Sequence, residues 1–100
     1  MWERQALYLE STYALFQGRC SEARSILKRI LDDQDPVNDP SMVAWPLMKI
    51  GMSYDLEKNR EKAISYYNDV LNMENGSGAQ FLAEKLLQNP LSRGDPFIGY

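Results

Sequence analysis

The sequence contains no histidine and only one cysteine. The lack of histidine excludes imidazole acid–base catalysis near neutral pH, histidine-ligated metal sites, and serine–histidine or cysteine–histidine nucleophile pairs. The single cysteine, Cys20, cannot form an internal disulfide and is too little for a structural zinc site. We therefore expect no enzyme active site, no cofactor and no bound metal.

The chain also lacks a long apolar run and an excess of positive charge. No stretch approaches the roughly 18 apolar residues of a membrane span, and the N-terminus has no signal-peptide core. The formal net charge is −3, and Arg24, Lys28 and Arg29 form only one short basic cluster. We expect no membrane and no nucleic-acid partner, and we favour a cytoplasmic location.

Helical periodicity is the main signal that the chain does contain. With 100 residues, of which 44% are hydrophobic, it is the size of one domain. Its clearest amphipathic stripe has apolar residues at i, i+3, i+4, i+7 and i+8, namely Ala23, Ile26, Leu27, Ile30 and Leu31. The same pattern predicts an all-α chain.

Turn and cap residues place the helix boundaries. We expect a first helix over about 3–17 that ends at a left-handed Gly18, and a second helix with Ser21 as its N-cap. Pro46 indicates an irregular turn over 41–45 and a regular helix from there to about 57. Two more helices follow, from after Asn59 to about 73 and over 78–88. Three apolar residues in the last four positions indicate that the tail packs back on the domain or continues into more chain.

A spaced motif occurs in the second half of the chain. It reads Leu47-x-x-Ile50-Gly51-x-x-Tyr54, followed by Ala63-x-x-x-Tyr67. This spacing resembles the tetratricopeptide repeat (TPR), in which W-x-x-L-G-x-x-Y precedes A-x-x-x-F.

A weaker copy of the motif, Ala23-x-x-x-Leu27, gives a period of 40 residues from Ala23 to Ala63, against roughly 34 in the family. The surplus falls in the polar loop over 32–40. The resemblance implies a right-handed superhelix of two antiparallel helix pairs, with repeats at about 4–35 and 42–75 and a capping helix and tail over 78–100. The small residues Ala23 and Ala63 are expected at close helix crossings.

The resemblance also implies a function, because such repeats bind other proteins and carry no chemistry. The first helix of each repeat lines a concave face, which here gives the candidate partner-binding residues Tyr8, Thr12, Phe16, Trp45, Met48, Lys49 and Met52. We expect Trp45, Met48 and Met52 to form one partly exposed stripe together with Tyr8. The alternative is that this stripe packs against the final helix, a further repeat or a second copy of the chain.

Three functional hypotheses remain open. The first is a module that binds a partner helix or peptide, in an array whose earlier repeats precede this chain. The others are a homodimeric assembly unit and the accessory domain of a larger enzyme. Two further motifs are interpreted as structural: the acidic cluster Asp32–Asp39 as a solvated loop rather than a calcium site, and Arg93-Gly94-Asp95 as a turn.

Overall fold

The chain forms five α-helices and no strand within the residues that the computed structural model describes. These residues are 2–32, 41–73, 78–91 and 98, and for 2–5, 41 and 42 they are described as backbone only. The helices are α1 (Trp2–Phe16), α2 (Cys20–Asp32), α3 (Ser41–Leu56), α4 (Arg60–Leu71) and α5 (Ala79–Gln88). The prediction of an all-α fold is confirmed.

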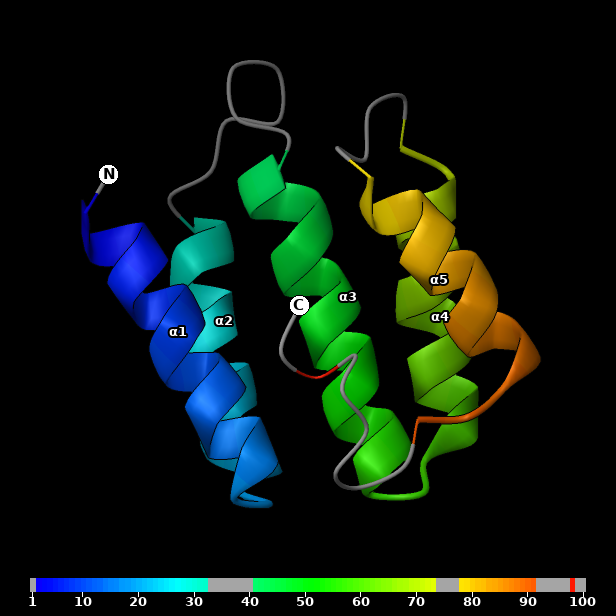
Figure 1. Ribbon diagram of the computed structural model, residues 1–100, viewed down its shortest axis with the longest axis horizontal. Coiled ribbons are helices and arrows are strands. Elements are labelled where there is room, and N and C mark those ends of the chain that lie inside the picture. Colours follow the sequence, from blue (N-terminus) through cyan, green and yellow to red (C-terminus); the bar gives the residue numbers. More distant parts are fainter. Residues whose placement is uncertain (1, 33–40, 74–77, 92–97, 99–100) are drawn as a thin grey trace.

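The helices pack in sequence order. α1 packs on α2, α2 on α3, α3 on α4 and α4 on α5, with smaller contacts of α3 to α1 and α5. In Figure 1, α1 lies in front of α2 and α5 lies in front of α4. One face of the molecule is therefore formed by α1, α3 and α5, and α2 and α4 form the opposite face. α3 is the central helix, because it contacts all four others.

The two turns inside the pairs α1–α2 and α3–α4 have the same geometry, 40 residues apart. Gly18 and Lys58 both have a left-handed backbone, with φ of 79° and 64°. In each turn the next amide donates at 2.8 Å to a carbonyl five residues earlier: Arg19 to Ala14, and Asn59 to Tyr54. The predicted left-handed Gly18 is confirmed, and a lysine adopts the same conformation in the second turn.

Small residues occupy the tightest helix crossings. Ala23 and Ala63 are completely buried, as expected. Gly51 lies on α3 where α4 comes closest, because a Cβ added there would lie 2.6 Å from a ring carbon of Tyr67. The α3–α4 crossing therefore requires a residue without a side chain at this position.

Two local predictions are wrong. α2 begins at Cys20, and the carbonyl of Arg19 already accepts the amide of Ala23 at 3.0 Å, so Arg19 and not Ser21 holds the N-cap position. α3 runs without a break from Ser41 through Pro46. Pro46 removes one backbone hydrogen bond, but its side chain is buried in the central helix of the fold, and this packing keeps the helix whole.

Several expectations lie outside the described residues. They concern the acidic loop after Asp32, the turn over 75–77 and the tripeptide Arg93–Asp95.

Candidate functional site

The predicted stripe on α3 is mostly buried. Met48, Lys49 and Met52 have no exposed surface, while Trp45 and Tyr8 are half-buried. The prediction that Met48 and Met52 are partly exposed is therefore wrong. The seven candidate residues do not form an open groove.

The reason lies in the position of α3. The sequence analysis assigned one stripe of this helix to the core, but α3 has neighbours on several sides. Met48 and Met52 belong to the largest hydrophobic cluster, together with Leu82 and Leu86 of α5. The alternative that this stripe packs against the final helix agrees with this arrangement.

The two remaining candidates on α1 lie apart from each other. Thr12 is buried, and its hydroxyl donates to the carbonyl of Tyr8 at 3.1 Å. Phe16 is 44% exposed. Only Phe16 is thus displayed to solvent as an apolar contact surface.

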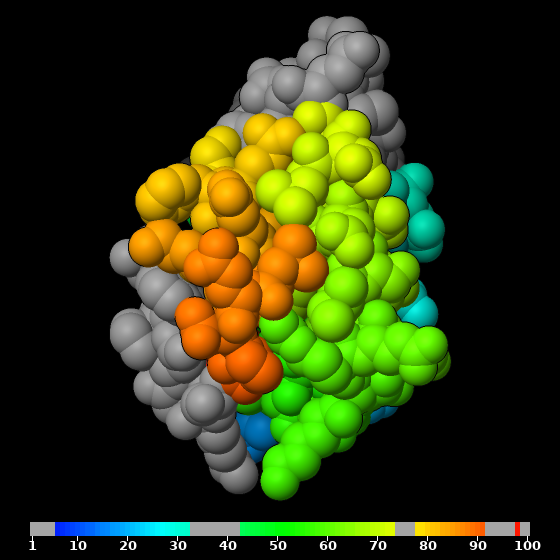
Figure 2. All heavy atoms as spheres, turned by 90° about the vertical axis from the view of Figure 1, so that its right-hand side faces the viewer, coloured from blue at the N-terminus to red at the C-terminus, as the bar shows by residue number. Residues whose placement is uncertain are grey.

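The face formed by α1, α3 and α5 is covered in part by residues that follow α5. The segment over 89–91 turns back from the end of α5 toward the end of α3 (Figure 1), and Figure 2 shows it against the last turns of α3. Leu91 is 4% exposed and Ile98 is completely buried, both in the same cluster as Met48 and Met52. Two residues outside the helices therefore complete the core on this face.

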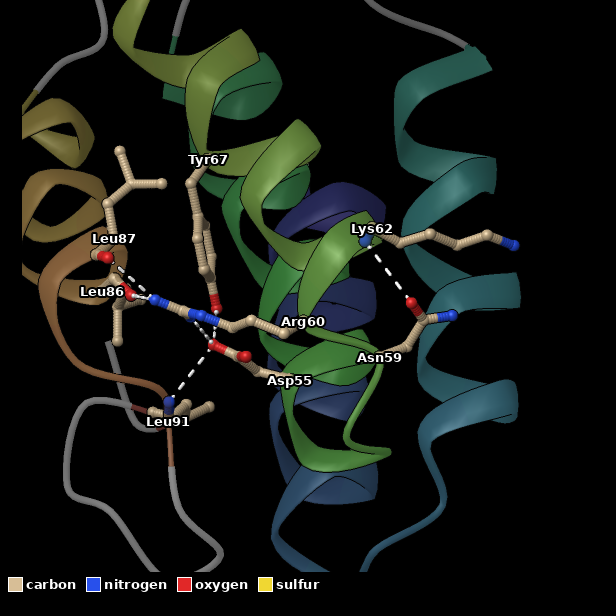
Figure 3. Close-up of polar contacts among 8 residues, drawn as sticks. All are labelled: Asp55, Asn59, Arg60, Lys62, Tyr67, Leu86, Leu87 and Leu91. Carbon is tan, nitrogen blue, oxygen red and sulfur yellow. Dashed lines mark hydrogen bonds and ion pairs between the residues drawn. The ribbon is translucent and has the colours of Figure 1, made fainter.

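Asp55 holds the first of these residues. Its carboxylate is almost fully buried at the end of α3 and accepts three hydrogen bonds: from Arg60 at 2.8 Å, from the hydroxyl of Tyr67 at 2.8 Å and from the backbone amide of Leu91 at 3.2 Å (Figure 3). Burial, and then the nearby Asp55 carboxylate, raise the pKa of Tyr67, so its hydroxyl stays protonated and acts as the donor.

Arg60 extends the same network to α5. Its second terminal nitrogen donates to the carbonyls of Leu86 and Leu87, at 2.7 and 2.8 Å. Both carbonyls lie in the last turn of α5, where no intrahelical donor remains. One guanidinium therefore neutralises Asp55 and also caps α5, and this fixes the direction in which the chain leaves that helix.

Lys49 holds the second residue. Its ammonium group donates a hydrogen bond to the carbonyl of Ile98 and lies 5.0 Å from the centre of the Tyr8 ring. Burial lowers the pKa of Lys49 to about 7, because the charged form loses its hydration. Burial also raises the pKa of Tyr8. The Lys49 amine therefore serves as a hydrogen-bond donor inside the protein.

Together these groups bind backbone. Asp55 accepts the amide of Leu91, Lys49 donates to the carbonyl of Ile98, and the side chains of both residues lie in the apolar cluster. This combination of apolar contacts and main-chain hydrogen bonds is how proteins hold an extended segment.

Sequence reasoning missed Asp55, Arg60, Leu91 and Ile98 as members of this site. The apolar tail was the one available signal, since it favoured packing back on the domain. The contact partners could not be found from it, because Leu91 and Ile98 lie 36 and 49 residues from the side chains that bind them.

Among the described residues, no group of three or more acidic or cysteine side chains could hold a metal ion. None of the helices described is long and apolar enough to cross a membrane. Comparison of the chain with known protein families, with curated proteins and with solved structures gives no match.

Proposed function

We propose that this protein is a non-catalytic protein-interaction module of the TPR type, and that the face formed by α1, α3 and α5 receives an extended apolar segment. The partner is a protein or peptide. The module works by shape and by hydrogen bonds to main chain, without a chemical step.

The internal symmetry of the helices supports the TPR part of this proposal. The two pairs repeat with the same turn geometry, and the small residues Ala23, Gly51 and Ala63 lie where helices approach most closely. In TPR proteins such pairs stack into a right-handed superhelix with the first helix of each pair on the inside. α1 and α3 hold that place here, and α5 follows as a third helix of the same kind.

The observation that carries the proposal is the burial of Leu91 and Ile98. Neither residue belongs to one of the five helices, yet both are sequestered against helices distant in sequence, with their backbone groups bound by buried side chains. A buried lysine and a buried aspartate that point to main chain would be costly without such a segment. The face is thus built for an extended occupant, and the chain's own residues take that place in the structure.

This arrangement defines the partner's chemistry. The partner segment carries two apolar side chains about seven residues apart, an amide for Asp55 and a carbonyl for Lys49. It competes with residues 91 and 98 for the same positions.

A peptide titration tests the proposal. A fluorescent peptide of residues 89–100 is titrated against the full chain and against the full chain with Leu91→Ser and Ile98→Ser. The double variant weakens the chain's own segment, which otherwise competes at the high effective concentration of a tethered ligand. We expect the variant to bind the peptide at least ten-fold more tightly than the unchanged chain does.

The control is the same peptide with both residues changed to serine, which is expected to bind neither protein. Circular dichroism establishes that the double variant is folded, and Ile98→Ser alone replaces it if it is not. Equal affinity of the folded variant and the unchanged chain for the peptide, or no binding at all, would refute the proposal.

A further inference from the structure

A second surface, separate from the peptide face, lies on the outer side of α1. Its large apolar residues are Leu9, Tyr13 and Phe16, which are 69%, 61% and 44% exposed. The spacings of four and three residues place them on one side of the helix. Contiguous exposed apolar side chains of this kind mark contact surfaces.

The internal repeat shows what normally covers this side of such a helix. α1 and α3 end at positions 40 residues apart, and the turns that follow them superpose residue by residue in their hydrogen bonds. Positions on α1 can therefore be compared with their counterparts on α3. Four consecutive positions of this side are exposed in α1, namely Ala6, Leu9, Glu10 and Tyr13, and all four counterparts are buried in α3, namely Pro46, Lys49, Ile50 and Ser53.

The preceding helix pair buries those positions in α3. Ile50 forms a cluster with Leu27 and Ile30 of α2. Ser53 accepts a hydrogen bond from Arg24 of α2 at 3.1 Å, and Lys49 lies beside the Tyr8 ring of α1. An antiparallel pair, α1–α2, is thus the cover of this side wherever the structure supplies one.

We propose that the Leu9–Tyr13–Phe16 side of α1 binds a further antiparallel helix pair, placed on α1 as α1–α2 is placed on α3. The pair belongs to a helical segment outside these 100 residues. It brings apolar side chains against Leu9 and Tyr13, and a basic residue in the place of Arg24. Arg24 stacks on Tyr54, 4.4 Å from the ring centre. The counterpart of Tyr54 is Ala14, which leaves room for such a cation to reach Glu10 one turn earlier.

A second copy of the chain does not fit this description. The surfaces of α2 and α4 that would have to cover α1 are already occupied by α3 and α5. The inference does not depend on the peptide face, because it concerns the other side of α1.

The test adds the missing pair to the complete chain. Residues 1–40 are repeated ahead of residue 1, so that the added α1–α2 and its loop reach α1 with the spacing by which residues 1–40 reach α3. Amide hydrogen exchange is then measured over residues 6–16 of the complete chain. We expect exchange there to slow at least ten-fold relative to the chain without the addition.

The matched control carries Leu9→Lys and Tyr13→Lys in the complete chain, and these exposed substitutions leave its fold intact. This control is expected to return exchange over 6–16 to the level of the chain without the addition, and Glu10→Lys is expected to weaken the protection partly. Unchanged exchange in the fusion would overturn the proposal. A dimer of the unmodified chain that Leu9→Lys abolishes, measured by light scattering, would also overturn it by making a second copy the occupant.

Discussion

The hydroxyl of Tyr67 on α4 donates a hydrogen bond of 2.8 Å to the carboxylate of Asp55 on α3. This bond crosses the α3–α4 interface at the point where Arg60 and the amide of Leu91 meet the same carboxylate. Asp55 therefore joins the second helix pair, the end of α5 and the segment after it. Most of the predictions below follow from this junction and from the face beside it.

Changes in the junction should scale with the charge that they leave unpaired. Tyr67→Phe removes one of three donors to a buried carboxylate and is expected to cost about 1–3 kcal/mol. Arg60→Ala leaves that carboxylate without its cation and leaves the α5 carbonyls uncapped, so we expect a loss of about 3–5 kcal/mol. Urea unfolding measures both, with the exposed Glu61→Ala as control. A smaller effect for Arg60→Ala than for Tyr67→Phe would contradict this account.

Gly51→Ala should destabilise the protein although alanine favours helices. The new methyl would lie 2.6 and 2.9 Å from two carbons of the Tyr67 ring, and the bond to Asp55 holds that ring in place. We expect a cost of about 1–3 kcal/mol from overpacking. Gly78→Ala is the contrasting variant, since nothing lies within 4 Å of its new methyl and its cost comes from the positive φ of 87° alone. Thermal unfolding of both variants compares the two effects, and an unchanged or raised stability of Gly51→Ala would show that α3 and α4 do not cross here.

Lys49 should give the stability a distinctive pH dependence. Its pKa is lowered to about 7 in the folded protein from 10.5, so between these values the unfolded chain binds more protons than the folded chain does. Stability then rises with pH over this range, by at most about 1.4 kcal/mol per pH unit. Lys49→Met removes the titration and keeps an apolar side chain of similar length.

Urea unfolding of both proteins at pH 6, 7.5 and 9 measures this difference. The lysine protein should gain on the methionine variant as the pH rises from 7.5 to 9, while below pH 7 the difference stays constant. The raised pKa of Tyr8 acts only above pH 10 and so lies outside this range. Parallel curves for the two proteins would mean that Lys49 is not desolvated.

Met48→Glu distinguishes core from surface on α3. Because Met48 has no exposed surface, the new carboxylate would be buried without a partner, and we expect the domain to lose several kcal/mol or to unfold. Tyr13→Glu is the matched change at an exposed site of α1 and should cost little. Circular dichroism melting of the two variants is sufficient, and an unaffected Met48→Glu would restore the open groove that the sequence suggested.

The helices could be predicted from sequence because their signals are local. The stripe from Ala23 to Leu31 defines α2, and Gly18 marks the end of α1. The two local errors arose where a competing interaction decides the outcome. The carbonyl of Arg19 takes the cap position ahead of Ser21, and packing keeps α3 helical through Pro46.

The site could not be predicted in the same way. Met48 and Met52 were assigned to a free surface because one helix face already held enough apolar residues for a core. Whether a second face is also covered depends on residues far along the chain, such as Leu91 and Ile98, and periodicity carries no information about them. The charge on Lys49 likewise favoured exposure until the carbonyl and the aromatic ring beside it were known.

The central claim is that the α1–α3–α5 face binds an extended segment, and methyl NMR of Met48 and Met52 tests it most directly. These methyl groups lie in the cluster that Leu91 and Ile98 complete, whereas Met73 follows the end of α4 and serves as the control. In the folded chain with Leu91→Ser and Ile98→Ser, both methyl resonances should shift from their positions in the unchanged protein. Adding the peptide of residues 89–100 should return them to those positions and leave Met73 nearly unmoved. Resonances of Met48 and Met52 that do not respond to saturating peptide would contradict the claim.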